Sequence, residues 1–376
     1  MAYSNVGTPV FYVDNYLYQK TLGVPLSDMP PTLESHFSYP NLTFLSGAPN
    51  IFNLNPSNAH YISADQYTDN IAISSPVKKL SDANSYDLSG NCKLYCAILN
   101  HSIYNGILSF ELANYNWTEF IPFQNHWDDT NYTDEMNGAN IGNGVSMPGN
   151  GTTIVSFDKL PPADFPNILA SWMPMDNDFA LGGFSVGIKY TMPHSPDLKL
   201  SMEIEMDGVD TITTSGGSSI SNIKYTGNPL WVNKETYSNP FEVFKSENYD
   251  VRESGARRNG RKSWSLKFSY MNDRDLFSSN IKADTYSDHE SDGTIADHYN
   301  TGDIEDDKLY FNIETDDSFY AQVWNKTLGG ALPFIFQPDS NFRDEFYICK
   351  FDQDSLKISQ SAYKVYDISV KIVEVW

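Results

Sequence analysis

Three carboxylates starting at Asp288 have the spacing of calcium ligands. In the run DHESDGTI, Asp288, Glu290 and Asp292 stand at alternate positions, and a glycine and then an isoleucine follow. EF-hand loops place carboxylates at positions 1, 3 and 5, glycine at 6, an apolar residue at 8 and a bidentate glutamate at 12. Position 12 is Tyr299 here, and no amphipathic helices flank the run. Two interpretations remain, a calcium site or, preferred, a solvated acidic insertion over residues 284–317.

The cysteines do not form a recognisable redox or metal motif. Cys92 and Cys96 on one strand would have Cα atoms about 13 Å apart, which is too far for a disulfide. A metal site on these two thiols and His101 would need a fourth ligand, and none follows at a familiar spacing. The sequence therefore predicts that both, with Cys349, are buried free thiols, and that His101 has a structural role.

Familiar catalytic signatures are missing from the sequence. It contains no G-x-S-x-G, no H-E-x-x-H and no phosphate-binding loop. Carboxylate pairs exist, but a glycosidase needs two that face each other across a sugar, which sequence alone does not place. We therefore expect a protein that is not an enzyme, with no catalytic residues and no cofactor.

The charge of the chain is strongly acidic, with one basic exception. The 376 residues include 48 acidic and 25 basic side chains, giving a formal net charge of -23. Such a surface repels nucleic acids and anionic membranes, so we expect no stable binding to either. The one dense basic cluster, RESGARRNGRK, is predicted to contact an acidic neighbour such as another copy of the chain, or passing DNA; the alternative is a plain hairpin loop. Its members are Arg252, Arg257, Arg258, Arg261 and Lys262.

The elements that must position these residues are predominantly strands. Alternation of apolar residues predicts half-buried strands from Phe184 to Tyr190, from Leu200 to Met206 and from Trp264 to Tyr270, with a last strand running to Trp376. One helix is predicted over Phe319–Leu328, capped by Asp317 or Ser318 and ended by two glycines. Asn-Gly before residues 107–112 predicts that they form a hairpin with residues 93–99. The predicted class is all-β, with jelly-roll or β-sandwich modules and one flanking helix.

Composition divides the chain into three predicted regions. Residues 1–50, rich in proline, asparagine and tyrosine, are interpreted as an extended arm lying on a neighbouring subunit. Residues 51–235 are predicted to form jelly-roll-like material, and residues 236–376 a second β-sandwich with the acidic insertion. The first twenty residues lack a signal-peptide pattern, and no apolar run of about 18 residues suggests a membrane span, so we expect synthesis in a cytoplasm.

The C-terminal segments resemble tail proteins of tailed phages. ARRNGRKSWSLKFSY, then DDSFYAQVWNKTLGGALPFIFQPD, then EFYICKFDQDSLKISQSAYKVYDISVKIVEVW are similar in order to distal tail and minor tail proteins of the tail tip. LYCAILNHSIYNGILSFEL resembles jelly-roll modules of virion proteins. The resemblance implies a β-sandwich with a helix on its flank, and rings, usually hexameric, that continue the tail tube. It also implies tail-tube and hub or baseplate proteins as partners, a place in the virion tail, and synthesis in a bacterial host.

Aromatic residues in the loop at 115–133 support a different function. Trp117, Trp127 and Tyr132 could stack on sugars, although packing in a core or an interface is commoner for such side chains. The alternative is therefore a carbohydrate-binding protein that adheres to host glycan, or less readily a polysaccharide depolymerase. The two functions are compatible within one tail protein.

Overall fold

The computed structural model describes residues 6–22, 51–56, 60–63, 71–76, 91–101, 107–113, 120–122, 132–134, 140–141, 145–146, 151–157, 167–172, 178–205, 209–223, 261–277, 317–342 and 345–375. Side chains are described for most of these residues, but for few of those between 60 and 76 and between 107 and 180. The statements below concern these residues.

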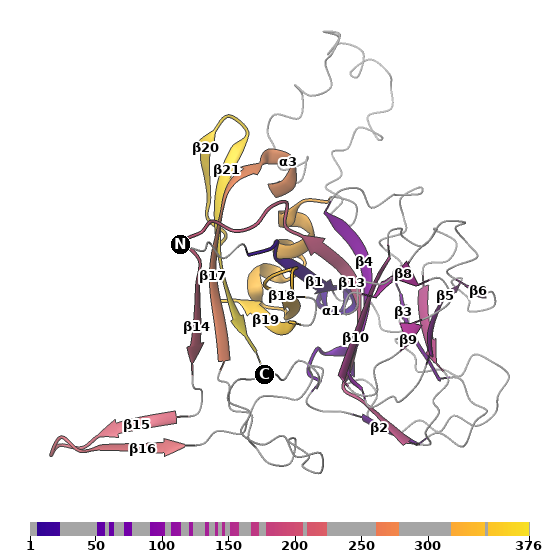
Figure 1. Cartoon of the computed structure of the whole chain (residues 1–376), viewed down its shortest axis with the longest axis horizontal. Helices are drawn as coiled ribbons and strands as arrows, with labels where there is room; N and C mark the ends of the chain where they lie inside the picture. The colour runs from indigo at the N-terminus through magenta and orange to yellow at the C-terminus, as the bar shows by residue number, and fades with distance from the viewer. Residues whose placement is uncertain are drawn as a thin grey trace, which may run out of the picture.

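The chain folds around one 12-stranded antiparallel sheet, which confirms the predicted all-β class (Figure 1). Its strands follow one another in an order that mixes early and late parts of the sequence. They are β14 (Ser201–Glu205), β17 (Arg261–Asn272), β21 (Val365–Glu374), β19 (Tyr347–Phe351), β18 (Phe334–Gln337), β1 (Val10–Asp14), β13 (Gly183–Thr191), β4 (Cys92–His101), β10 (Gly151–Phe157), β7 (Tyr132–Asp134) and β8 (Asn140–Ile141), with β20 (Ile358–Ala362) paired to β21.

Three smaller sheets and a few short helices complete the described structure. The second sheet contains β3 (Ile71–Pro76), β11 (Asn167–Trp172), β5 (Ile107–Ala113) and β6 (Phe120–Pro122), with β9 (Val145–Ser146) on β5. Two strand pairs are β12 (Asp178–Leu181) with β2 (His60–Ser63), and β15 (Val209–Thr213) with β16 (Ser219–Ile223). The helices are α1 (Asn15–Thr21), α3 (Asp273–Leu276), the π-helix η3 (Tyr320–Asn325) and the 3-10 turn η4 (Leu328–Gly330).

The large sheet curls around the larger of two hydrophobic clusters, and the smaller cluster, which includes Tyr12 and Tyr95, is separate from it. Trp264 and Phe268 of β17 lie in the same buried cluster as Phe184 and Ile188 of β13, although four strands separate β17 from β13 in the sheet. Phe11 of β1 lies in the same cluster. Because both ends of this stretch of sheet enclose one core, the arrangement is sandwich-like.

Strand β1 corrects the prediction of an extended N-terminal arm. Val10–Asp14 is buried at every position and pairs with β13 on one side and β18 on the other. Phe11 and Tyr12 are completely buried. Four consecutive apolar residues, VFYV, fit a central strand covered on both faces. Residues 23–50 lie outside the described residues, so the rest of the predicted arm stays a prediction.

The predicted regions of the chain share the main sheet. Strand β14 from the 51–235 region pairs with β17 from the 236–376 region, and β1 lies between strands of both. The predicted boundary at 235–236 falls outside the described residues. Strands from all three predicted regions are therefore hydrogen-bonded to one another in a single sheet.

The predicted hairpin of residues 93–99 with 107–112 is wrong, although both strands exist. β4 pairs with β10 and β13, whereas β5 belongs to the second sheet, where it pairs with β6, β9 and β11. Both edges of β4 are occupied, and it is buried at eight of its ten positions. A strand that is central in one sheet has no free edge for its sequence neighbour.

The helix predicted at Phe319–Leu328 is confirmed in place and differs in type. Tyr320–Asn325 is a π-helix, and a 3-10 turn follows. The Ala321 amide donates to the Ser318 hydroxyl over 3.2 Å, as expected for a residue near the start of the helix. Gly329 and Gly330 have φ of 64° and 102°, so the two glycines end the helix in a left-handed conformation.

Candidate assembly surface

Strand β14, with the sequence SMEIE, is an edge strand whose two apolar side chains the described chain leaves uncovered. All five of its residues are exposed, including Met202 at 51% and Ile204 at 53%. Met202 pairs with the buried Trp264 of β17, so its side chain lies on the core face of the sheet but beyond the rim of the core. The alternation from Leu200 to Met206 predicted a half-buried strand. The prediction of a half-buried strand is wrong for β14, because no second layer of described residues covers its apolar side chains.

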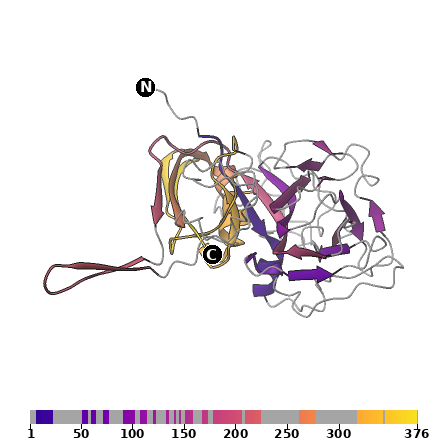
Figure 2. The same cartoon turned by 60° about the horizontal axis from the view of Figure 1, so that its bottom comes forward.

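A β-hairpin follows β14 and extends away from the body of the molecule (Figures 1 and 2). Strands β15 and β16 pair over five residues each. Ile212 and Ile220 are opposite each other and are 64% and 59% exposed. Cross-strand apolar pairs stabilise a hairpin, but two strands alone are marginal in water.

The tip of the hairpin is a defined turn. The Thr214 amide donates to the Ser218 carbonyl over 2.8 Å, and the Ser218 amide donates to the Thr214 hydroxyl over 3.1 Å. Gly217 adopts a φ of +81°, which favours glycine. The segment Ser215–Ser219, predicted to be a loop, is thus the closure of a hairpin whose second strand begins at Ser219.

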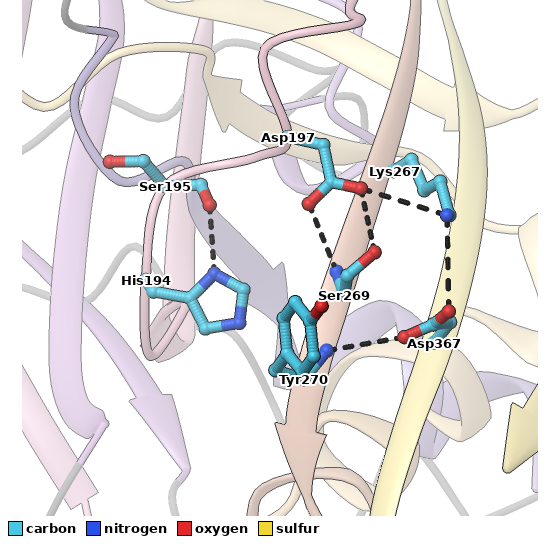
Figure 3. Close-up of polar contacts among 7 residues, drawn as sticks. All are labelled: His194, Ser195, Asp197, Lys267, Ser269, Tyr270 and Asp367. Carbon is cyan, nitrogen blue, oxygen red and sulfur yellow. Dashed lines mark hydrogen bonds and ion pairs between the residues drawn. The ribbon is translucent and has the colours of Figure 1, made fainter. Parts of the chain in front are cut away.

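A polar clip holds the segment before β14 against β17 (Figure 3). The Asp197 carboxylate accepts from the Ser269 amide over 3.2 Å and from the Ser269 hydroxyl over 2.7 Å. The Asp197 amide in turn donates to the Lys267 carbonyl over 2.7 Å. These bonds fix the chain within a few residues of Ser201, so they set where the edge strand begins.

The same clip stabilises a bulge in β17. The pairing of β17 with β21 shifts register between Phe268 and Met271, and Tyr270 in the bulge has a φ of 64°. The Tyr270 amide donates to the Asp367 carboxylate over 3.2 Å, and the Lys267 ammonium lies 3.8 Å from Asp367 (Figure 3). The bulge turns the Tyr270 ring outward, to 77% exposure, and puts Met271 in the core.

Two members of the basic cluster lie beside the edge strand. Arg261 and Lys262 begin β17 and pair with Glu205 and Ile204 of β14. The Lys262 ammonium donates to the Tyr347 hydroxyl over 2.6 Å and lies 4.4 Å from the centre of that ring. Lys262 therefore contributes to folding within the chain, in addition to any contact with a neighbour. The remaining members, Arg252, Arg257 and Arg258, lie outside the described residues.

The other predicted site residues lie outside the described residues or have side chains that are not described. Asp288, Glu290 and Asp292 fall outside the described residues, and so do Trp117 and Trp127. Tyr132 begins β7, but its side chain is not described. No group of three or more histidine, cysteine or acidic residues with metal-binding geometry occurs among the residues that the structure describes.

The predicted free thiols and the structural histidine are confirmed. Cys92, Cys96 and Cys349 are buried and unpaired with one another. His101 is buried at the end of β4, and its Nε2 lies 2.9 Å from the Thr153 hydroxyl. Burial lowers the pKa of His101 to about 3, which keeps the ring neutral.

A buried polar network joins β1, α1, β4 and β13, and the sequence prediction missed it. The Asp14 carboxylate accepts from the Leu17 amide over 2.7 Å and from the Ser185 hydroxyl over 2.6 Å. The Tyr95 hydroxyl lies 2.6 Å from the same Ser185 hydroxyl. Burial raises the pKa of Asp14 to about 6. An aspartate just before a short helix is a capping signal, and could have indicated α1 from sequence.

Comparisons with known proteins add no family: no protein-family model matches the chain, and no curated protein sequence matches it. Among the described helices, none is both long enough and apolar enough to span a bilayer. The assignment of a function therefore rests on the sequence resemblance and on the uncovered surfaces described above.

Proposed function

We propose that this protein is a non-enzymatic structural subunit that assembles with copies of itself in a phage tail, as a ring at the distal end of the tail tube. The observation that carries the proposal is that an uncovered edge strand, β14, is followed in the chain by a projecting hairpin, β15–β16. Monomeric proteins rarely expose connected apolar strands, and such surfaces mark protein contacts. The tail location rests on the C-terminal resemblance.

The chemistry of this surface suits permanent assembly better than catalysis. β14 and β15–β16 present an open edge, exposed isoleucines and a methionine, with serines, threonines and the glutamates Glu203 and Glu205 between them. An apolar centre within a polar surround is the usual composition of a subunit interface. Tail-tube and hub or baseplate proteins are the proposed further partners, and no cofactor is required.

The proposal is tested by the oligomeric state of the purified full chain, measured by mass photometry and negative-stain imaging. Rings of uniform size are expected. A triple variant, Arg252→Gln with Arg257→Gln and Arg258→Gln, is expected to reduce ring formation, because it removes the basic charge that faces an acidic neighbour. Arg261 and Lys262 are left intact, since Lys262 also stabilises the fold.

The matched control removes three positive charges elsewhere in the sequence, from the exposed Lys20 and Lys357 and from Lys308. If both triple variants form rings like the parent, the basic cluster has no role in assembly. If the parent itself stays monomeric at all concentrations, and also when mixed with tail tubes, the ring proposal fails. Glycan binding by that monomer would then favour the carbohydrate-binding function.

A further inference from the structure

The edge strand β14 and the hairpin β15–β16 follow each other in the sequence, and both have unpaired edges in the described structure. Strand β14 and both strands of the hairpin each have five residues. β14 is the last strand of the large sheet in the described chain, so its outer edge pairs with no described strand. The hairpin has an outer edge on each side for the same reason. Each element thus offers the backbone groups that the other could pair with.

We propose that the hairpin β15–β16 of one copy adds to the free edge of β14 in the next copy, so that the large sheet continues across the subunit boundary. This inference rests on the proposed function, because it names the partner of the assembly surface. Strand addition satisfies the backbone donors and acceptors of both edges, and side-chain pairs give it specificity. Ile212 and Ile220 would then lie on the side of the sheet that carries Met202 and Ile204.

The direction of the hairpin favours a second copy over the hairpin's own chain as the occupant. Only residues 206–208 separate β14 from β15. The hairpin extends outward from the end of β14 and does not fold back along it (Figures 1 and 2). Its isoleucine pair is therefore presented to another molecule.

Charge also favours a second copy. With a net charge of -23, two copies of the chain repel over most of their surfaces. The hairpin, residues 209–223, carries only one charged residue, Asp210. At the β14 edge, Glu203 and Glu205 are acidic, and Glu205 pairs with Arg261, which starts the neighbouring strand. In the sequence, the basic run 252–262 leads directly into that strand. The hairpin therefore brings a single negative charge to this edge, so it meets less repulsion there than the rest of the acidic surface would.

The proposed contact is heterologous, because the hairpin of one copy meets a different surface on the next. Heterologous contacts close into a ring when the rotation between copies allows it, and otherwise make a filament. In a closed ring, every subunit both gives a hairpin and receives one, so the outer edge of every β14 is paired.

Cysteine crosslinking tests the contact directly. The three native cysteines are buried, so an introduced cysteine at position 204, 212 or 220 is the reactive one in the described surface. Ile204→Cys is purified alone, and so are Ile212→Cys and Ile220→Cys. The edge variant is then mixed with each hairpin variant, subunits are exchanged and the mixture is oxidised. Directly opposed residues on neighbouring strands have Cβ atoms about 5 Å apart, close to disulfide geometry.

The expected result is a disulfide-linked dimer in at least one mixed sample and none in any variant alone. Dimers from Ile212→Cys or Ile220→Cys alone would show a hairpin-to-hairpin contact and would overturn the inference. Rings that persist without any mixed crosslink would overturn it while leaving the proposed ring function intact. Monomers throughout would reject both.

A second pair of variants guards against misfolding. Ile212→Ser combined with Ile220→Ser changes only exposed side chains, so folding measured by circular dichroism should be kept while rings are lost. Tyr363→Ser, at a position 81% exposed in the turn between β20 and β21, is the control and should keep its rings. Rings in the double serine variant at the parent's concentration dependence would contradict the inference.

Discussion

Replacing Asp14 by asparagine should change how the stability of the protein depends on pH. The Asp14 side chain is 3% exposed, and desolvation raises its pKa from 3.8 to about 6 although Ser185 and backbone amides hydrogen-bond to it. A carboxyl whose pKa is raised by folding binds its proton more tightly in the folded state. Its contribution is therefore fully present below the unfolded pKa and is lost as the pH rises through about 6.

The size of the effect follows from the pKa difference. About 2 pKa units, at about 1.4 kcal/mol per unit, correspond to about 3 kcal/mol between strongly acidic and neutral solution. About half of this, on the order of 1 to 2 kcal/mol, should appear between about pH 7.5 and about pH 5. Asparagine has no such titration, and its amide oxygen can still accept from the Leu17 amide. The stability of Asp14→Asn relative to the parent should therefore fall by that amount as the pH is lowered.

Urea denaturation of both proteins at the two pH values, followed by tryptophan fluorescence, measures this difference. Comparing variant with parent cancels the general effect of the acidic surface. Asp354→Asn, at an exposed aspartate, is the control and should show no such pH-dependent difference. If the difference between Asp14→Asn and the parent is the same at both pH values, the carboxyl is not desolvated and the reasoning is refuted.

Three other substitutions test the packing. Gly187→Ala should destabilise the protein by about 3 kcal/mol in thermal melts, because a Cβ there would lie 1.9 Å from the Val13 carbonyl oxygen, whereas Gly216→Ala meets nothing within 4 Å and should be nearly neutral. Tyr270→Gly should stabilise by about 1 kcal/mol in urea denaturation, because its φ of 64° costs a tyrosine energy and its ring is exposed; a loss of stability would show that the ring is needed. Gln19→Met should also stabilise by about 1 kcal/mol, since the Gln19 amide is buried and has no hydrogen-bond partner among the described residues. A decrease would indicate an ordered water bound there.

The sequence predicted strands well where a local pattern decides the structure. Trp264, Leu266 and Phe268 alternate and are all buried, as predicted. The alternation continues to Tyr270 in the sequence, but the bulge breaks it in the structure. Whether a strand bulges depends on its neighbour, here Asp367 of β21, which is nearly a hundred residues away. Periodicity in one segment contains no information about that partner.

Pairing between distant strands was the part that sequence could not supply. The run at Val10–Asp14 is apolar enough for a central strand, but its proline- and asparagine-rich surroundings suggested an arm. The hairpin of β4 with β5 was predicted from a local turn signal, and the burial of β4 on both faces overrode it. Part of the candidate assembly surface could be predicted. The alternation of apolar and polar residues correctly predicted strand β14, but the sequence did not show that its apolar side chains are exposed.

The position of β1 determines when the protein can finish folding. β1 is synthesised long before one of its partners, β18, and the Tyr12 hydroxyl donates to Gln337, 325 residues later. β1 cannot pair with β18 until the chain has left the ribosome as far as Gln337, and contacts at such sequence separation slow folding. A fragment that starts after residue 14, including either 51–235 or 236–376 on its own, lacks the strand that joins β13 to β18. Adding a peptide of residues 6–22 to a fragment that holds both β13 and β18 would restore the missing strand between them.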